Sequence, residues 1–232
     1  MIISNSKYWF VLCLLILANS VFSQVPDSVR NWDNQLYLSD KVAGVVGNWR
    51  LSGELQVRLK DNWGSLDRTF FEGVATYMPS ESIEIVPDFR ITVKPDRVEY
   101  RPGLGVIYKF IKSDFQFVNQ LKWQLDIYPN NFANNAVRYA VFLNQVIHEK
   151  VIVTFVGGAL YKWTDDYIGF SFVRFGPGIA FVINEQQTIN FSYLLSATNN
   201  TQSWEWAGIP FIQLVININR HDKYVPAKYI SF

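Results

Sequence analysis

The chain has little of several residues that carry chemistry in other proteins. Its 232 residues include one cysteine and two histidines, and only 18% are charged. The cysteine, Cys13, lies in an amino-terminal apolar run, so a chain that loses this run has no thiol. Disulfides, zinc-thiolate sites and cysteine nucleophiles are then excluded. Basic and acidic residues number 21 and 20, so no charge excess indicates nucleic acid binding and no acidic tail indicates disorder.

The amino terminus has the layout of a secretory signal peptide. Lys7 precedes the apolar run "YWFVLCLLILA" at 8–18, which is too short to span a bilayer comfortably. Val21 and Ser23 occupy the small-residue positions of a signal-peptidase site. We predict cleavage near Ser23, directly before Gln24. Because Cys13 lies inside the run and not at its end, a lipoprotein anchor is not indicated.

Alternation dominates the rest of the chain. In "NWRLSGELQVRLKDN", residues 48–62, apolar and polar residues alternate almost without fault, and the same period returns at 82–94, 98–110 and 114–127. A period of two is typical of a β-strand with one apolar and one polar face. Looser versions are found at 67–78, 136–148, 150–163, 166–183, 187–197 and 203–219. The pattern predicts about ten strands after residue 47, and 31–39 adds a candidate for one more.

Strand length and turn spacing together favour a membrane barrel. Segments such as "PSES" and "NEQQ" are rich in turn residues, so consecutive strands are expected to pair as antiparallel hairpins. The strands run for about twelve to fourteen residues, against about five or six in soluble proteins. Twelve residues at roughly 3.3 Å each, tilted by about 45°, cover on the order of 28 Å, which is near the hydrocarbon thickness of a bilayer. The sequence predicts an all-β fold, an antiparallel up-and-down transmembrane β-barrel of about 10 to 12 strands.

Aromatic residues support the membrane barrel because they lie at or near the predicted strand ends, as in the interfacial girdles of membrane barrels. They are Trp49, Tyr77, Tyr100, Phe110, Tyr128, Trp163, Tyr167, Trp204 and Trp206. The apolar face of 48–62 is therefore expected to face lipid and its charged face a closed lumen.

The domain organisation follows from these patterns. Residues 1–23 form the signal peptide, 24–46 an amino-terminal segment with room for one strand, 47–219 the barrel, and 220–232 a tail that ends in Phe232. Three prolines, Pro87, Pro102 and Pro177, fall inside predicted strands, where each removes a ladder hydrogen bond. We expect β-bulges at these prolines.

The predicted lumen is lined by charged residues of both signs. The candidates are Arg50, Glu54, Arg58, Glu72, Glu84, Asp88, Arg90, Glu99, Arg101, Lys122, Asp126, Arg138 and Arg174. They could form a pore lining or a polar ligand site. We favour the other interpretation, a set of mutually satisfied ion pairs, because buried charges must be paired and a barrel of about ten strands has little spare room.

Not all of the predicted inner face is polar. Phe142, Val156 and Leu160 fall on the lumen side, which predicts either dry packing or contact with the amino-terminal segment. "RPGLG" and "RFGPG" lack the strand-to-helix context of a phosphate loop. Their inward glycines are expected to let strands bend or bulky lumen side chains approach.

No catalytic centre, metal site or cofactor site can be named from the sequence. The two histidines, His148 in a predicted turn and His221 in the tail, are far apart, and no serine comes with a recognisable base. Two alternatives stay open: a lipid-modifying barrel enzyme using carboxylates such as Glu99 and Asp126, and a secreted soluble barrel with an apolar interior that binds a hydrophobic ligand.

The early Trp32 and Trp49 with "ELQVRLKDN", the following "FFEGVATYMP" and the later "VRYAVFLNQ" resemble a family of uncharacterised outer-membrane β-barrel proteins of Bacteroidota, a domain of unknown function. The resemblance covers nearly the whole mature chain and departs at the carboxyl-terminal tail. It implies fold and location but no activity. We therefore expect a barrel in the outer membrane of a Gram-negative bacterium, with a structural, solute-binding or narrow-pore role. Its expected partners are membrane lipid and a small polar solute, and not nucleic acid.

Overall fold

The computed structural model describes residues 32–129, 133–164, 167–199 and 203–218, which form one sheet of twelve strands. The strands are β1 (Trp32–Asn34), β2 (Leu36–Val46), β3 (Trp49–Lys60), β4 (Ser65–Tyr77), β5 (Ile83–Val93), β6 (Val98–Lys112), β7 (Phe115–Ile127), β8 (Ala133–His148), β9 (Val151–Trp163), β10 (Ile168–Val182), β11 (Gln187–Asn199) and β12 (Trp204–Asn217). Among these residues no helix is long and apolar enough to cross a membrane. The predicted signal peptide and the tail at 220–232 lie outside the described residues.

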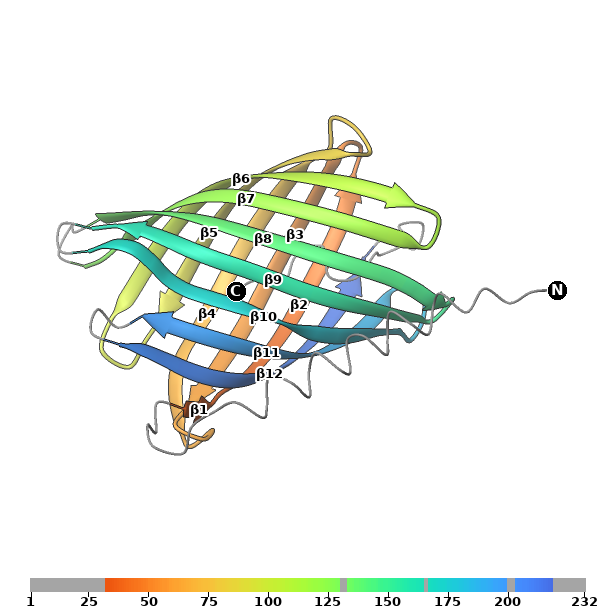
Figure 1. Ribbon diagram of the computed structural model, residues 1–232. Coiled ribbons are helices and arrows are strands. Elements are labelled where there is room, and N and C mark those ends of the chain that lie inside the picture. Colours follow the sequence, from red (N-terminus) through yellow and green to blue (C-terminus); the bar gives the residue numbers. More distant parts are fainter. Residues whose placement is uncertain (1–31, 130–132, 165–166, 200–202, 219–232) are drawn as a thin grey trace. The chain divides into compact units, whose positions relative to one another are not determined.

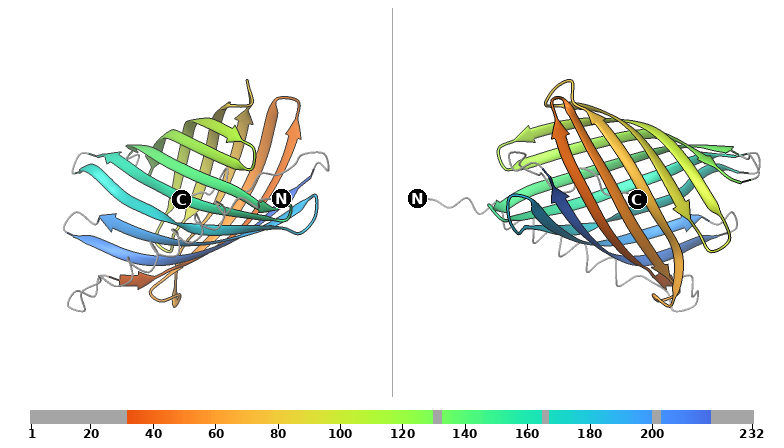
Figure 2. Two further views of the ribbon diagram at one scale, coloured as in Figure 1. Left: turned by 45° about the vertical axis from the view of Figure 1, so that its right-hand side comes forward. Right: turned by 180° about the vertical axis from the view of Figure 1, so that it is seen from behind.

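The sheet closes into a barrel (Figures 1 and 2). From β2 to β12 each strand pairs with the next in antiparallel register, and β12 then returns to β2, with Phe211 opposite Tyr37. This closing ladder is parallel, because an odd number of alternating strands brings the last one back in the direction of the first. The predicted all-β barrel of 10 to 12 strands is confirmed. Its parallel seam was not predicted, because turn patterns determine only the neighbours along the chain.

Strands β1 and β2 follow β12 in one register, with Trp32 opposite Trp206. The interruption at Gln35 lies next to Pro210, which has no backbone N–H to give to a ladder. The strand expected at 31–39 therefore extends to Val46. A two-residue turn then leads into β3, and its first residue, Gly47, has a φ of 59°.

The faces of the barrel have the polarity of a membrane barrel. Leu51 and Leu121 point outward and are 53% and 56% exposed, whereas the inward Glu54 and Gln56 are 1% and 0% exposed. Exposed Leu, Ile, Val, Phe, Tyr and Trp side chains recur on the outer faces of the strands. This is the apolar-outside, polar-inside arrangement typical of transmembrane barrels. It is the reverse of the inverted soluble barrel, which the structure does not favour.

The expected bulges at the prolines are wrong. Each of the three prolines, Pro87, Pro102 and Pro177, pairs in regular register with one neighbouring strand. Towards the other neighbouring strand the pairing is interrupted at the proline and then resumes in the same register. A proline lacks one N–H, so it needs to lose pairing on one side only. The irregularities of register lie elsewhere, at Arg58/Leu59, Phe170/Phe172 and Val146/His148.

The registers also determine the width of the lumen. One circuit around the ladders displaces the pairing by about 14 residues, which for eleven strands corresponds to a tilt of roughly 40° and a backbone radius of about 10 Å. An arginine side chain reaches about 7 Å from its Cα. Inward side chains from opposite walls therefore meet near the barrel axis.

Candidate functional site

The structure places the sequence-predicted charged residues on the inner wall or at its two ends. Those that are buried are Glu54, Arg58, Glu72, Glu84, Asp88, Arg90, Arg101, Lys122, Arg138 and Arg174. Arg50, Glu99 and Asp126 lie nearer the strand ends and are partly exposed. The prediction missed the buried cations Lys41 and Lys109. The alternation in "LYLSDKVA" would have found Lys41 had the first strand been extended past residue 39.

Buried cations outnumber buried carboxylates inside the barrel. Among the described residues eight Lys and Arg side chains are buried, against four Asp and Glu side chains. A closed set of one-to-one ion pairs needs equal numbers, so the ion-pair interpretation accounts for only part of the wall. The cations beyond those pairs give the lumen a positive character.

Glu72 on β4 is the centre of the largest ion-pair cluster. Arg90 donates to it with N–O distances of 3.2 and 3.0 Å, and Arg101 and Lys122 approach it at 3.2 and 3.3 Å. Lys122 also donates to Asp88 at 2.6 Å. These side chains come from the four neighbouring strands β4 to β7. One stretch of the wall therefore holds two carboxylates, Glu72 and Asp88, and three cations, Arg90, Arg101 and Lys122.

Two further carboxylates pair on either side of this cluster. Glu54 accepts a hydrogen bond from Ser39 at 2.8 Å and lies 3.8 Å from Lys41. Glu84 accepts from Lys109 at 2.5 Å. These pairs are the part of the lumen that the sequence interpretation of mutually satisfied charges describes.

A second arrangement alternates arginines with aromatic rings, and we call it the arginine-aromatic belt. It consists of Arg58, Arg90, Arg138 and Arg174 with Tyr37, Phe70 and Phe172. The ring centroid of Phe70 lies 3.8 Å from the guanidinium carbon of Arg90 and 5.1 Å from that of Arg58. The ring centroid of Tyr37 lies 4.2 Å from the guanidinium carbon of Arg58 and 5.7 Å from that of Arg174. The ring centroid of Phe172 lies 4.3 Å from the guanidinium carbon of Arg174 and 6.0 Å from that of Arg138.

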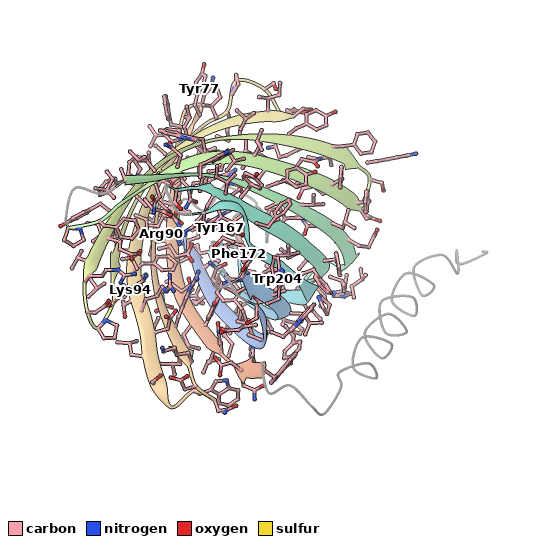
Figure 3. All side chains as sticks on the ribbon, turned by 60° about the vertical axis from the view of Figure 1, so that its left-hand side comes forward. Tyr77, Arg90, Lys94, Tyr167, Phe172 and Trp204 are labelled. Carbon is pink, nitrogen blue, oxygen red and sulfur yellow. The ribbon has the colours of Figure 1, made fainter. Side chains whose placement is uncertain are left out.

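The belt bridges the lumen from wall to wall. Its members come from β5, β4, β3, β2, β10 and β8, and the contact of Arg174 with Tyr37 joins strands that are not neighbours in the sheet. Arg90 and Phe172 lie inside the barrel in Figure 3. Each guanidinium is held over the face of a ring, which stabilises a buried cation without neutralising its charge. The belt is therefore a fixed positive constriction.

Two belt arginines have no acidic partner. Among the described residues, no carboxylate lies within 4 Å of Arg138 or Arg174, although Arg174 Nε donates to Ser196 Oγ at 3.0 Å. Arg138 Nε and Arg174 Nη1 are buried and have no hydrogen-bond acceptor. Buried polar groups are normally hydrogen-bonded, so these donors are unusual and mark the belt as a candidate binding element.

A vestibule leads to the belt from one end of the barrel. We call this end the N-terminal mouth, because β1 begins there, beside the turn at residues 61–64. The cavity has a volume of about 480 Å³, with Trp32, Asp33 and Trp206 among its lining residues and Tyr37 and Arg174 at its inner end. This volume is in the range of small-molecule sites.

The turn beside the vestibule is held in an unusual backbone conformation. Asp61, Asn62 and Trp63 all have positive φ values, of 55°, 54° and 69°. Asn34 donates to the side chain of Asn62 at 2.7 Å, and the Asn62 backbone N–H donates to Asp33 at 3.0 Å. Non-glycine residues in this region cost free energy and persist only where surrounding contacts hold them. The rim of the vestibule is therefore anchored to β1.

Beyond the belt a buried apolar cluster shares the lumen with hydrogen-bonded polar side chains such as Gln116, Asn144 and Thr154. Ile107, Val118, Phe142 and Val156 are completely buried and belong to one packed cluster with belt residues Tyr37 and Phe172. Both outcomes expected for the apolar inner face are found together, because the cluster is dry packing and includes Tyr37 of the amino-terminal segment 24–46. Phe142 and its neighbours close the lumen at this level.

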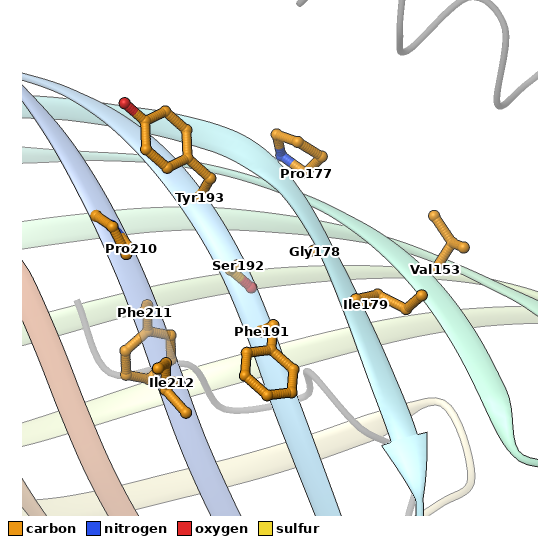
Figure 4. A pocket seen from close by; sticks show the side chains of 10 residues that line it. All are labelled: Val153, Pro177, Gly178, Ile179, Phe191, Ser192, Tyr193, Pro210, Phe211 and Ile212. Atoms are coloured by element: carbon orange, nitrogen blue, oxygen red, sulfur yellow. The ribbon is translucent and has the colours of Figure 1, made fainter.

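A second hollow lies on the outer surface of the barrel. This groove of about 500 Å³ runs across β9 to β12, and Figure 4 shows Pro177, Tyr193 and Pro210 along it. Its lining is almost entirely apolar, with Phe191 and Ile212 among its members. It is continuous with the apolar outer face, so it fits lipid contact and not a site for polar solutes.

Each of the two carboxylates proposed for the enzyme alternative is held by cations of its own. Glu99 accepts from Lys94 and Arg97 at 2.7 Å each, and Asp126 lies 3.2 Å from Lys162. The described residues contain no group of three or more His, Cys, Asp and Glu side chains that could hold a metal ion. His148 is exposed at the end of β8, and His221 lies outside the described residues.

Comparisons with known proteins agree with the fold. No protein-family model and no curated protein sequence matches the chain. Among solved structures, a NanC porin superposes with a TM-score of 0.51 at 11% identity, covering 70% of this chain and 86% of that one. A KdgM porin reaches 0.46 at 14% identity (71% and 89% covered), and a KdgM porin in complex with disordered oligogalacturonate reaches 0.46 at 13% (75% and 93%). At 11% identity the likeness to the NanC porin shows the barrel fold alone.

Proposed function

We propose that the protein is an outer-membrane β-barrel that binds small solutes in its lumen and passes them through a narrow pore. The observation that carries the proposal is the polarity of the closed barrel, whose outer face is apolar and whose inner wall is rich in buried charged and polar side chains. An apolar exterior of this extent is stable in lipid, and a charged interior serves polar solutes. The sequence-based expectation of an outer-membrane location, after signal-peptide cleavage near Ser23, belongs to this proposal.

The packed lumen makes the pore narrow. Phe142 and Val156 are completely buried beyond the belt, so a solute passes only when such side chains move. Side-chain rearrangement within a rigid barrel is rapid compared with the opening of strands. We therefore expect a small conductance, well below that of an open water-filled porin.

The first experiment tests location and closure together. Outer-membrane fractions of cells expressing the full chain are run in detergent gels with and without heating. We expect the protein in the outer membrane and a change in mobility on heating, as for a closed barrel. A protein found in the soluble fraction, with no mobility change, would overturn the proposal.

The second experiment tests passage. Purified protein is reconstituted in planar bilayers, and its current in potassium chloride is compared with that of Phe142→Ala, which removes the ring from the packed layer. We expect a small current for the parent and a larger one for the variant. Large, open-pore currents from the parent would contradict the packed lumen, and no current from either protein would reject passage.

A further inference from the structure

We propose that the inner end of the vestibule is an oxyanion site, with Arg174 as its anchor, for the carboxylate or phosphate group of a small solute. The proposal rests on the proposed function only in that solutes reach the vestibule from the N-terminal mouth. The observation that carries it is a side chain that is buried, charged, unpaired with any carboxylate of the described chain and part of the wall of a cavity.

Arg174 is fixed in place before any solute arrives. Its guanidinium carbon lies 4.3 Å from the ring centroid of Phe172 and 5.7 Å from that of Tyr37, and its Nε donates to Ser196. Its Nη1 has no acceptor in the described structure, although Arg174 is only 8% exposed. A guanidinium offers its donors in a planar fork that matches the two oxygens of a carboxylate or phosphate.

The charges around the vestibule are arranged so that Arg174 keeps its attraction for an anion. The other two cations that line the cavity each have a carboxylate within 4 Å, since Arg68 donates to Asp67 at 2.6 Å and Lys60 lies 3.9 Å from Asp61. Asp33 accepts from the backbone of Asn62. Among the described residues Arg174 has only the Ser196 hydroxyl as a hydrogen-bond partner, so it is the lining cation without a carboxylate, at the inner end of the cavity.

The belt adds to the field at this point. Arg174 is repelled by Arg68 and Arg90 and attracted by Asp67, and Arg138 is repelled by Arg58, Arg90 and Arg101 and attracted by Glu72, so each has more cationic than carboxylate neighbours. Mutual repulsion of like charges at close range costs free energy that an oxyanion between them offsets. The site should therefore prefer compact anions over neutral solutes of the same size.

The walls of the vestibule suggest the rest of the solute. Tyr37 offers an aromatic ring, and Gln35, Asn62 and Thr198 offer hydrogen-bonding groups. With about 480 Å³ available, the cavity fits one small hydroxylated or ring-bearing molecule with an oxyanion at its inner end. Larger polymers would have to enter end first.

The test is calorimetric titration of the detergent-solubilised full chain with sodium succinate, sodium phosphate and neutral glucose at equal ionic strength. We expect saturable binding of one or both anions and none of glucose, and Arg174→Gln should weaken anion binding by at least about tenfold. The matched control is Arg97→Gln, which removes the same charge from an exposed turn. Glu99 keeps Lys94 as a partner in that variant, so its anion binding should equal that of the parent.

A further variant separates charge from geometry. Arg174→Lys keeps the charge but lacks the fork, so it should bind anions more weakly than the parent and more strongly than Arg174→Gln. All variants must show the heat-dependent gel mobility of the parent, which establishes that the barrel has formed. Equal weakening by Arg97→Gln and Arg174→Gln, or no anion binding by the parent, would overturn the site.

This outcome is separate from that of the proposed function. Anion binding without current would keep the oxyanion site and reject passage. Current without anion binding would keep the pore and reject the site. Phosphate and succinate distinguish the two oxyanion sources, because a site that takes only one of them identifies its group.

Discussion

Adding one methyl group at Gly103 should break the ion pair between Lys122 and Asp88 in the lumen. Gly103 faces inward on β6, opposite Gln124 of β7. A Cβ built there would lie 2.6 Å from Cε of Lys122 and 2.9 Å from both carboxylate oxygens of Asp88. Contacts this short are not tolerated, so Gly103→Ala forces Lys122 and Asp88 away from the 2.6 Å hydrogen bond that joins them.

The expected magnitude follows from two opposing effects. Overpacking a filled interior costs about 1–3 kcal/mol, and a buried ion pair disturbed at the same time adds to this cost. Replacing glycine within a strand returns about 0.5–1 kcal/mol through the entropy of the unfolded chain. Gly103→Ala should therefore be less stable than the parent by roughly 1–2 kcal/mol, which for a chain of this size lowers the midpoint of thermal unfolding by several degrees, at about 2–4 °C per kcal/mol.

The matched control is Gly73→Ala on β4, where an added Cβ meets no atom within 4 Å. That variant should be as stable as the parent or slightly more stable. The assay is the temperature at which half of the protein shows the unfolded gel mobility in detergent. If Gly103→Ala is no less stable than Gly73→Ala, the close packing of Lys122 against Gly103 is refuted. In a Lys122→Ala background the added methyl group should cost less, because its shortest contact is gone and only the Asp88 carboxylate still has to shift.

Three other substitutions test separate parts of the structure. Leu121→Arg, at the middle of β7 and 56% exposed, should cost about 2–4 kcal/mol in bilayers, whereas Phe110→Arg, on the outer face near the end of β6, should cost at most about 1 kcal/mol; equal folding yields in lipid vesicles would argue against a lipid-facing exterior. Phe142→Ala should destabilise the barrel by about 3–5 kcal/mol as measured by the same gel midpoint, since the ring is completely buried; an unchanged midpoint would show that the layer is not packed. Phe70→Leu removes the ring between Arg58 and Arg90 and should lower the midpoint by a few degrees, and a loss no larger than that of an exposed Phe71→Leu would deny the belt its stabilising role.

The sequence determined the fold class and the facing of most residues. A period of two places Leu51, Leu55 and Leu59 on the side opposite Glu54 and Arg58 whatever the tertiary structure, because successive side chains of an extended chain point to opposite faces. The length of the strands then selected a bilayer as the environment of the apolar face. Both inferences are local, so they needed no knowledge of register.

The tertiary structure decided which inward residues meet. Arg174 and Tyr37 are 137 positions apart in the chain, and their contact depends on the closure of β12 onto β2, which no turn sequence encodes. The grouping of Arg58, Arg90, Arg138 and Arg174 around three aromatic rings likewise depends on the stagger of the strands. Alternation identifies which residues face the lumen, but only the register and the closing seam bring the arginines and aromatic rings into one belt. In a tilted barrel each strand is shifted along its neighbour, so the depth of a residue depends on the added shifts of all the strand pairs before it.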